Sequence, residues 1–150
     1  MSAYFIALLV AAVAGSAMAI QGSINSLLSK SIGLLETTFI VHAVGLVFAG
    51  GLLAAQLGDG SITQVGKGHW YSYLGGILGV AIVYGVAMAI PRAGVANATT
   101  AIIIFQLSTA IVLDHFGFFG LEIIPFNWYK LAGLVLLAIG GYLMLGVGSR

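Results

Sequence analysis

The sequence has no cysteine and very little charge. Lysine, arginine, aspartate and glutamate together make up 6% of its 150 residues, whereas a soluble domain carries about 25%. So few charges cannot cover the surface of a water-soluble particle. The absence of cysteine excludes disulfides, thiolate metal sites and thiol redox chemistry. The net charge of +1, with no clustered basic face, argues against a nucleic-acid partner.

Hydrophobic residues are abundant instead: they make up 61% of the chain and form five long runs. A helix needs about 20 apolar residues to cross a bilayer. The runs also lack the alternation of polar and apolar residues that strands of membrane barrels show. We therefore predict an all-α integral membrane bundle of about five transmembrane helices, forming a single transmembrane domain over residues 1–150. The predicted spans are residues 3–28, 35–57, 70–90, 95–113 and 131–147.

The first apolar run resembles a signal peptide. The stretch from Ala3 to Ala14 is followed by Ala17, Met18 and Ala19, which resemble a cleavage site. No lysine or arginine precedes this run, however, and the apolar character returns four more times. We expect the run to be retained as the first span.

The basic residues of the loops indicate orientation only weakly. With five spans, Lys67 and Lys130 fall on one side of the membrane, and Lys30, Arg92 and Arg150 on the other. Because cytoplasmic loops carry the excess of lysine and arginine, the favoured topology places the C-terminus in the cytoplasm. So small a difference also fits insertion in both orientations, and that alternative stays open. We expect a multi-pass protein of the plasma (inner) membrane.

Glycine is about twice as frequent as usual, with 22 residues, many of them inside the spans. Gly75 and Gly79 form a G-x-x-x-G pair, and similar small-residue stripes occur on the first and fifth spans. The members of those stripes are Gly15, Ala19 and Gly22, and Gly133, Gly140 and Gly141. In lipid, small residues allow helices to approach closely. The stripes therefore predict packing within one chain or contact between two chains.

Five helices leave little room for a substrate path that is shielded from lipid. Many secondary transporters build such a path from two inverted repeats, and this sequence has no convincing internal repeat. If the chain transports a solute, we expect a second chain to supply the other half. The partner would be a second copy, in which case the homodimer could be antiparallel, or a sister chain in a heterodimer.

Polar side chains at membrane depth are costly unless they face the bundle interior, water or a partner. Seven such residues are our candidates for lining a substrate path: Gln21, Asn25, Glu36, His42, Tyr84, Asn97 and Gln106. Glu36 and His42 are also the candidates for ion or proton coupling. Five of these candidates have a second interpretation: the two amides of the first span could cap its frayed end, and Glu36 could lie at the membrane surface. His42 could be a neutral imidazole bonded to a backbone group or a threonine, and Gln106 could bond a neighbouring helix.

No group of residues resembles a hydrolase site, a metal site or a phosphate-binding loop. The glycine-rich stretch from Gly75 to Gly79 lies inside a hydrophobic span, where a nucleotide loop is not expected. We therefore predict no catalytic residue, no metal and no cofactor, and we do not expect an enzyme.

The order of several motifs along the chain resembles a known family. They are IQGSINSLLSKSIG ending the first span, Tyr73-Leu74-Gly75-Gly76 with Gly79, Ile90-Pro91-Arg92-Ala93-Gly94, Gln106-Leu107 and Asp114-His115-Phe116-Gly117. Together they look like the YdcZ-type family, half-size members of the drug/metabolite transporter superfamily. The resemblance implies five transmembrane helices, a transport role and pairing of two half-size chains. Related small multidrug resistance proteins have a carboxylate in the first span, and this sequence has none there, so Glu36 or His42 would have to supply any coupling.

The leading hypothesis is a dimeric secondary transporter of a small solute or metabolite. The path would lie between the first four spans, whereas the fifth, nearly free of polar groups, would serve packing or the dimer contact. The alternatives are a non-transporting membrane subunit and a component of a flippase for lipids or lipid-linked substrates. The residues do not identify the solute, the direction of transport or the driving ion.

Overall fold

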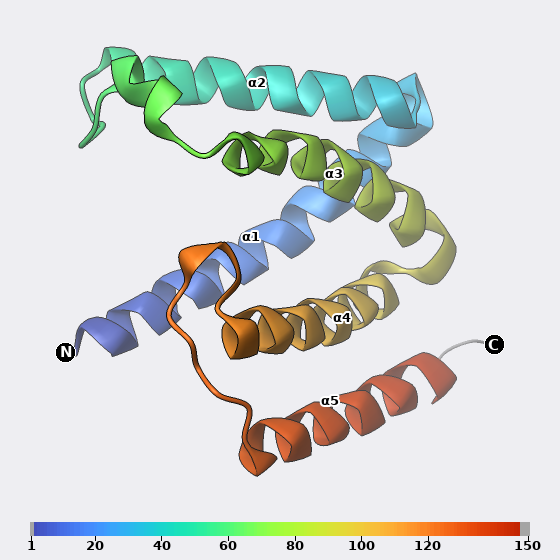
Figure 1. Ribbon diagram of the computed structural model, residues 1–150. Helices are drawn as coiled ribbons and strands as arrows, with labels where there is room; N and C mark the ends of the chain where they lie inside the picture. The colour runs from blue at the N-terminus through green and yellow to red at the C-terminus, as the bar shows by residue number, and fades with distance from the viewer. Residues whose placement is uncertain (1, 148–150) are drawn as a thin grey trace. The chain divides into compact units, whose positions relative to one another are not determined.

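Five long helices make up most of the computed structural model, which describes residues 2–147 (Figure 1). They are α1 (Ala3–Ile32), α2 (Leu34–Ala54), α3 (Leu74–Ala93), α4 (Val95–Phe116) and α5 (Trp128–Val147). Short 3-10 helices follow α2 and α4: η1 (Ile62–Lys67), η2 (Trp70–Tyr73) and η3 (Phe118–Gly120). The described residues contain no strand, and all five long helices are apolar and long enough to cross a membrane. The prediction of an all-α membrane bundle is confirmed.

The turn between α1 and α2 is a single residue. The first span was expected to end near residue 28, but α1 continues to Ile32 because Lys30 and Ser31 are both compatible with a helix. Gly33 ends it with a φ of 100°, a conformation that glycine adopts without steric penalty. In contrast, α2 ends at Ala54, three residues before the predicted end, and the chain then turns through Gln56 at a φ of 60°.

The turn between α3 and α4 is also shorter than the predicted Pro91–Gly94 turn, since α3 includes Pro91 and ends at Ala93. A proline in the last turn removes one backbone N–H, and the Arg92 guanidinium donates a hydrogen bond to the Met88 carbonyl in that turn. Gly94, with a φ of 83°, separates the two helices. Arg150, one of the basic residues used to predict the membrane orientation, lies outside the described residues.

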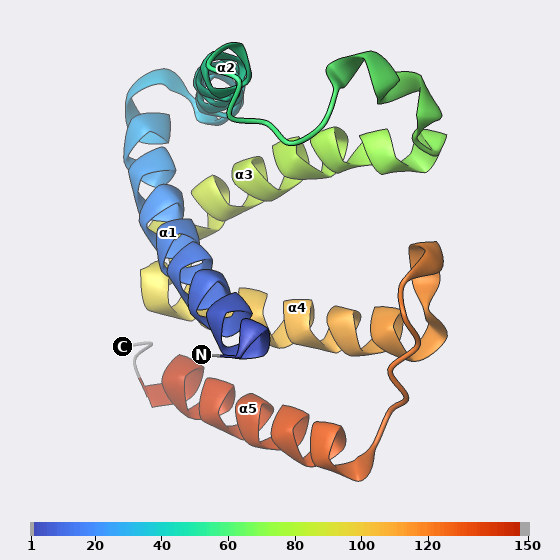
Figure 2. The same ribbon diagram turned by 90° about the vertical axis from the view of Figure 1, so that its left-hand side faces the viewer.

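The chain divides after Arg92 into two compact units. The first holds α1 to α3. Helix α1 contacts α2, and Figures 1 and 2 show the C-terminal half of α3 meeting α1. At that crossing a Cβ added to Gly22 would stand 2.8 Å from Val86 Cγ1 and 3.0 Å from Ile90 Cδ1. The missing side chain of Gly22 therefore allows α3 to approach.

The second unit holds α4 and α5, which pack against each other. A Cβ added to Gly141 of α5 would overlap Ile104 and stand 3.2 Å from Thr100 Cγ2. The Thr100 hydroxyl donates to the Ala96 carbonyl at 2.9 Å and lies 3.6 Å from the sulfur of Met144. As in the first unit, one glycine sets the distance between two helices.

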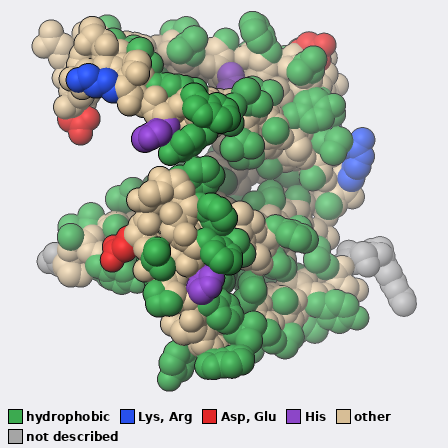
Figure 3. Space-filling view, in the orientation of Figure 1, with side chains coloured by type: hydrophobic (Ala, Val, Ile, Leu, Met, Phe, Trp, Pro, Cys, Tyr) green, Lys and Arg blue, Asp and Glu red, His purple; other side chains and the backbone are tan. Residues whose placement is uncertain are grey.

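The surface is mostly hydrophobic, and the interior holds more polar side chains than a soluble core would. Figure 3 shows hydrophobic side chains across the visible helices, with acidic and basic ones scattered singly. The buried hydrophobic residues among those described are Ala87, Ile90 and Ala98. The buried polar residues are Asn25, Ser26, Thr37, Thr38 and Thr100. This distribution suits a protein whose solvent is lipid, because exposed apolar side chains carry no penalty there.

Candidate functional site

Four of the buried polar side chains lie close together in the sequence around the Gly33 turn of the first unit. Asn25 and Ser26 of α1 are each 4% exposed, and Thr37 and Thr38 of α2 are 0% and 1% exposed. We call these four residues the buried polar cluster. Burying a polar group away from water is unfavourable unless a hydrogen bond compensates. The hydrogen bonds of each side chain therefore decide whether its burial is compensated.

The hydroxyls of the cluster are paired unequally. Thr38 Oγ1 donates to the Leu34 carbonyl at 2.8 Å, the usual bond from a threonine to the preceding turn of its own helix. Thr37 Oγ1 is fully buried, and no residue from 2 to 147 forms a hydrogen bond with it. The side-chain amide of Asn25 also makes no hydrogen bond with residues 2–147. The cluster thus keeps hydrogen-bonding groups available.

His42 lies one turn beyond Thr38 on α2 and is half-buried. Its Nδ1 is 2.7 Å from the Thr38 carbonyl oxygen, which can only accept, so Nδ1 carries a hydrogen and donates it. In the neutral ring, Nε2 is then an acceptor. A Cβ added to Gly79 of α3 would stand 3.4 Å from this Nε2. The free nitrogen therefore faces bare backbone, and no side chain from that position covers it.

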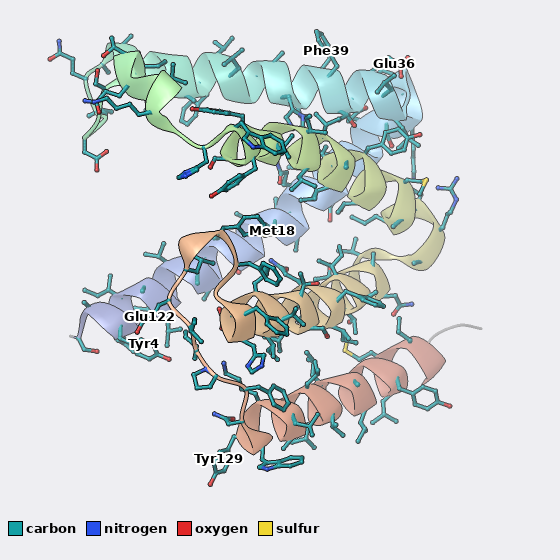
Figure 4. The ribbon with its side chains drawn as sticks, viewed as in Figure 1. Tyr4, Met18, Glu36, Phe39, Glu122 and Tyr129 are labelled. Carbon is teal, nitrogen blue, oxygen red and sulfur yellow. The ribbon has the colours of Figure 1, made fainter. Side chains whose placement is uncertain are left out.

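Glu36 is not part of the cluster. Its side chain is exposed on α2, and its carboxylate folds back towards Gly33 at the start of the helix. There a carboxylate interacts favourably with the positive end of the helix dipole. Figure 4 shows Glu36 and Phe39 on the face of α2 that is turned away from α3, where they line an open apolar recess with Leu35 and Ile40.

The other predicted path residues are less buried than Asn25. Gln21 is exposed, although it lies one turn before Asn25 on the same helix. Tyr84 of α3 is 37% exposed. In the second unit, Asn97 is half-buried and Gln106 exposed. Of the seven candidates, the first unit brings Asn25 and His42 into or next to the buried polar cluster.

Asp114 and His115 anchor the segment that joins α4 to α5. Asp114 pairs with Lys130 at 3.8 Å. His115 Nδ1 accepts from the Phe126 backbone N–H at 3.2 Å. Gly117, in the left-handed conformation, ends α4. This Asp-His-Phe-Gly motif therefore has a structural role in the loop, as does Asn127, whose side chain caps α5 by accepting from the Lys130 N–H at 2.9 Å.

Sequence reasoning did not include Ser26, Thr37 and Thr38 among the path candidates. Helical spacing could have indicated two of them, since Ser26 lies one turn after Gly22 and Thr38 one turn before His42. Nothing in the sequence distinguishes the unpaired hydroxyl of Thr37 from the paired one of Thr38.

Residues 6–143 match the family model described as "Putative inner membrane exporter, YdcZ". The chain belongs to this family. The match confirms the resemblance drawn from the motifs, and with the five apolar helices it makes the protein a multi-pass inner membrane protein of the YdcZ exporter family. An exporter is a non-enzymatic kind of protein. No curated protein and no solved structure matches the chain.

Proposed function

We propose that this YdcZ-family chain exports a small solute or metabolite as a secondary transporter, working as a dimer of five-helix halves. The observation that supports a solute path is the buried polar cluster, because unpaired polar groups inside a membrane protein are costly unless they serve a ligand. The family match supports the transport role, and we propose that the solute binds at the cluster.

In this proposal Asn25 and His42 line the path at the buried polar cluster, and Glu36 lies at the membrane surface. The further path residues are Gln21, Tyr84, Asn97 and Gln106. His42 is a better candidate for coupling than Glu36. The Thr38 carbonyl fixes the Nδ1 hydrogen, so Nε2 is the atom that would take up and release a proton. Glu36 is exposed instead and folds towards Gly33.

The position of the cluster along the helices suits loading from the cytoplasm. Thr37 lies four residues after Gly33 and Asn25 eight residues before it, or about 6 and 12 Å along their helices at 1.5 Å per residue. Lys30 at the end of α1 and Arg92 at the end of α3 share this side in a five-span topology. Positive residues mark the cytoplasmic side, so in the favoured topology the Gly33 turn next to the cluster faces the compartment from which an exporter takes its solute.

A second chain would complete the path. Gln21 is exposed in the single chain, and a Cβ added to Gly15 on the same helix would meet nothing within 4 Å. A polar amide facing lipid is unfavourable, so this part of α1 is suited to contact a partner. A second copy in the opposite orientation, or a sister chain, would pair with it.

Reconstitution of the purified protein tests the proposal. Liposomes with and without protein are loaded with a metabolite extract from the host cell, and the released solutes are measured by mass spectrometry. Release of particular solutes only from the protein-containing liposomes supports an exporter. Transfer of labelled lipid without solute release would support a flippase, and neither activity would support a subunit of a larger complex.

The same liposomes test the coupling. An imposed pH gradient is expected to change solute release by the wild type and by Glu36→Gln. His42→Ala should no longer respond to the gradient. Unchanged responses in both variants would exclude coupling through these two residues.

A further inference from the structure

We propose that the buried polar cluster binds a small, uncharged solute that carries hydroxyl or amide groups. This inference rests on the proposed function and narrows it to a substrate class.

The cluster offers no charge to a charged ligand. Its four members are neutral, and the His42 ring is neutral too whenever its Nε2 serves as an acceptor. Glu36, the carboxylate nearest in sequence, is exposed and turned towards Gly33. Lys30, the nearest cation in sequence, is exposed at the end of α1. A buried ion without a partner of opposite charge carries a large desolvation penalty. An uncharged ligand avoids that penalty.

The unpaired groups indicate what an uncharged ligand should carry. Helical hydroxyls in this protein usually donate to the carbonyl one turn earlier, as those of Ser23, Thr38 and Ser108 do. Thr37 does not, although it is completely buried. Its hydroxyl can donate to a ligand oxygen, the Asn25 amide can both donate and accept, and His42 Nε2 can accept. A hydroxyl or an amide group carries both donors and acceptors, so a ligand with such groups could pair with any of these side chains.

Two neighbouring threonines provide a matched pair of variants. Valine has nearly the same shape as threonine but no hydroxyl. Thr37→Val removes the unpaired hydroxyl, so it should leave the melting temperature of the purified protein unchanged or higher, because it removes an unsatisfied buried group. Thr38→Val removes a hydroxyl of equal burial that is already bonded to Leu34. The affinity for a ligand should therefore fall in Thr37→Val and stay near the wild-type value in Thr38→Val.

Binding is measured on the purified full chain in lipid nanodiscs with five radiolabelled probes: glycerol, glucose and uridine as neutral ones, and tetraphenylphosphonium and succinate as charged ones. At least one neutral probe should bind the wild type. Its Kd should rise about tenfold in Thr37→Val, as expected for one lost hydrogen bond, and should change less than twofold in Thr38→Val. Well-folded Thr37→Val that binds like the wild type would mean that the cluster holds water only, and would overturn the inference.

Two other results would also overturn it: binding of none of the neutral probes, or binding of a charged probe that Thr37→Val weakens. These results leave the exporter function itself untouched, because that depends on solute release from liposomes. Conversely, a reconstituted protein that releases no solute removes the exporter function, whatever the cluster binds.

Discussion

Replacing Gly22 by alanine should weaken the packing of α3 against α1. The new Cβ would stand 2.8 Å from Val86 Cγ1 and 3.0 Å from Ile90 Cδ1, whereas carbon atoms in contact prefer about 3.5–4.0 Å. The terminal methyl of Ile90 can move, but Val86 is branched at Cβ and held in one rotamer in a helix. Overpacking of this kind costs about 1–3 kcal/mol. Alanine regains up to about 1 kcal/mol as the better helix former. The free energy of unfolding should therefore fall by about 0–2 kcal/mol, which is about 1–3 kcal/mol below a glycine-to-alanine change that makes no such contact.

Gly15 of the same helix is the matched control, because a Cβ there would meet nothing within 4 Å. Gly15→Ala should be neutral or more stable by up to about 1 kcal/mol, from helix propensity alone. The measurement is unfolding by sodium dodecyl sulfate in mixed micelles, followed by circular dichroism. A Gly22→Ala protein as stable as Gly15→Ala would refute the role of Gly22 in this helix crossing.

Three further predictions concern the other helices and the topology. Gly141→Ala, whose Cβ would overlap Ile104, should destabilise the α4–α5 pair in the same unfolding assay, whereas Gly140→Ala, which meets nothing, should not. Gly79→Ala would place a methyl group 3.4 Å from Nε2 of His42. The contact is an ordinary one, so stability should not fall, but the methyl group would cover Nε2, so solute release from liposomes should fall several-fold. Gly75→Ala, whose Cβ meets nothing, should release solute like the wild type. Reporters fused to the C-terminus should give a cytoplasmic signal for the favoured topology, and signals from both sides of the membrane would establish insertion in both orientations.

The fold could be predicted from the sequence largely because the bilayer restricts which segments can cross it. A span must be apolar for about 20 residues and must pair its own backbone groups, which leaves a helix as the only choice for these runs. The ends of the spans were harder to predict. Lys30 and Ser31 are compatible with a helix that continues to Ile32, and Pro91 is compatible with a last helical turn. Only the positive φ of Gly33 and Gly94 decided where those helices ended.

The candidate site was predictable only in part, because burial depends on which helix faces which. Gln21 and Asn25 share one face of α1, yet the first is exposed and the second buried. Among the glycine stripes, Gly79 meets His42 and Gly75 meets nothing. Helical spacing places the members of each pair on the same face. Their different burial and contacts depend on where the neighbouring helix crosses, which the sequence does not reveal.

The most direct test of the central claim, that the buried polar cluster serves solute export, compares the medium of cells that make different variants. Metabolites in the medium are profiled for cells producing the wild type, Asn25→Ala or Ser16→Ala at equal membrane levels. Ser16 is an exposed residue of the same helix whose hydroxyl already bonds the Ala12 carbonyl. The wild type and Ser16→Ala should enrich the same few solutes in the medium, and Asn25→Ala should fall to the level of cells without the protein. Export by Asn25→Ala equal to that of the wild type would contradict the claim.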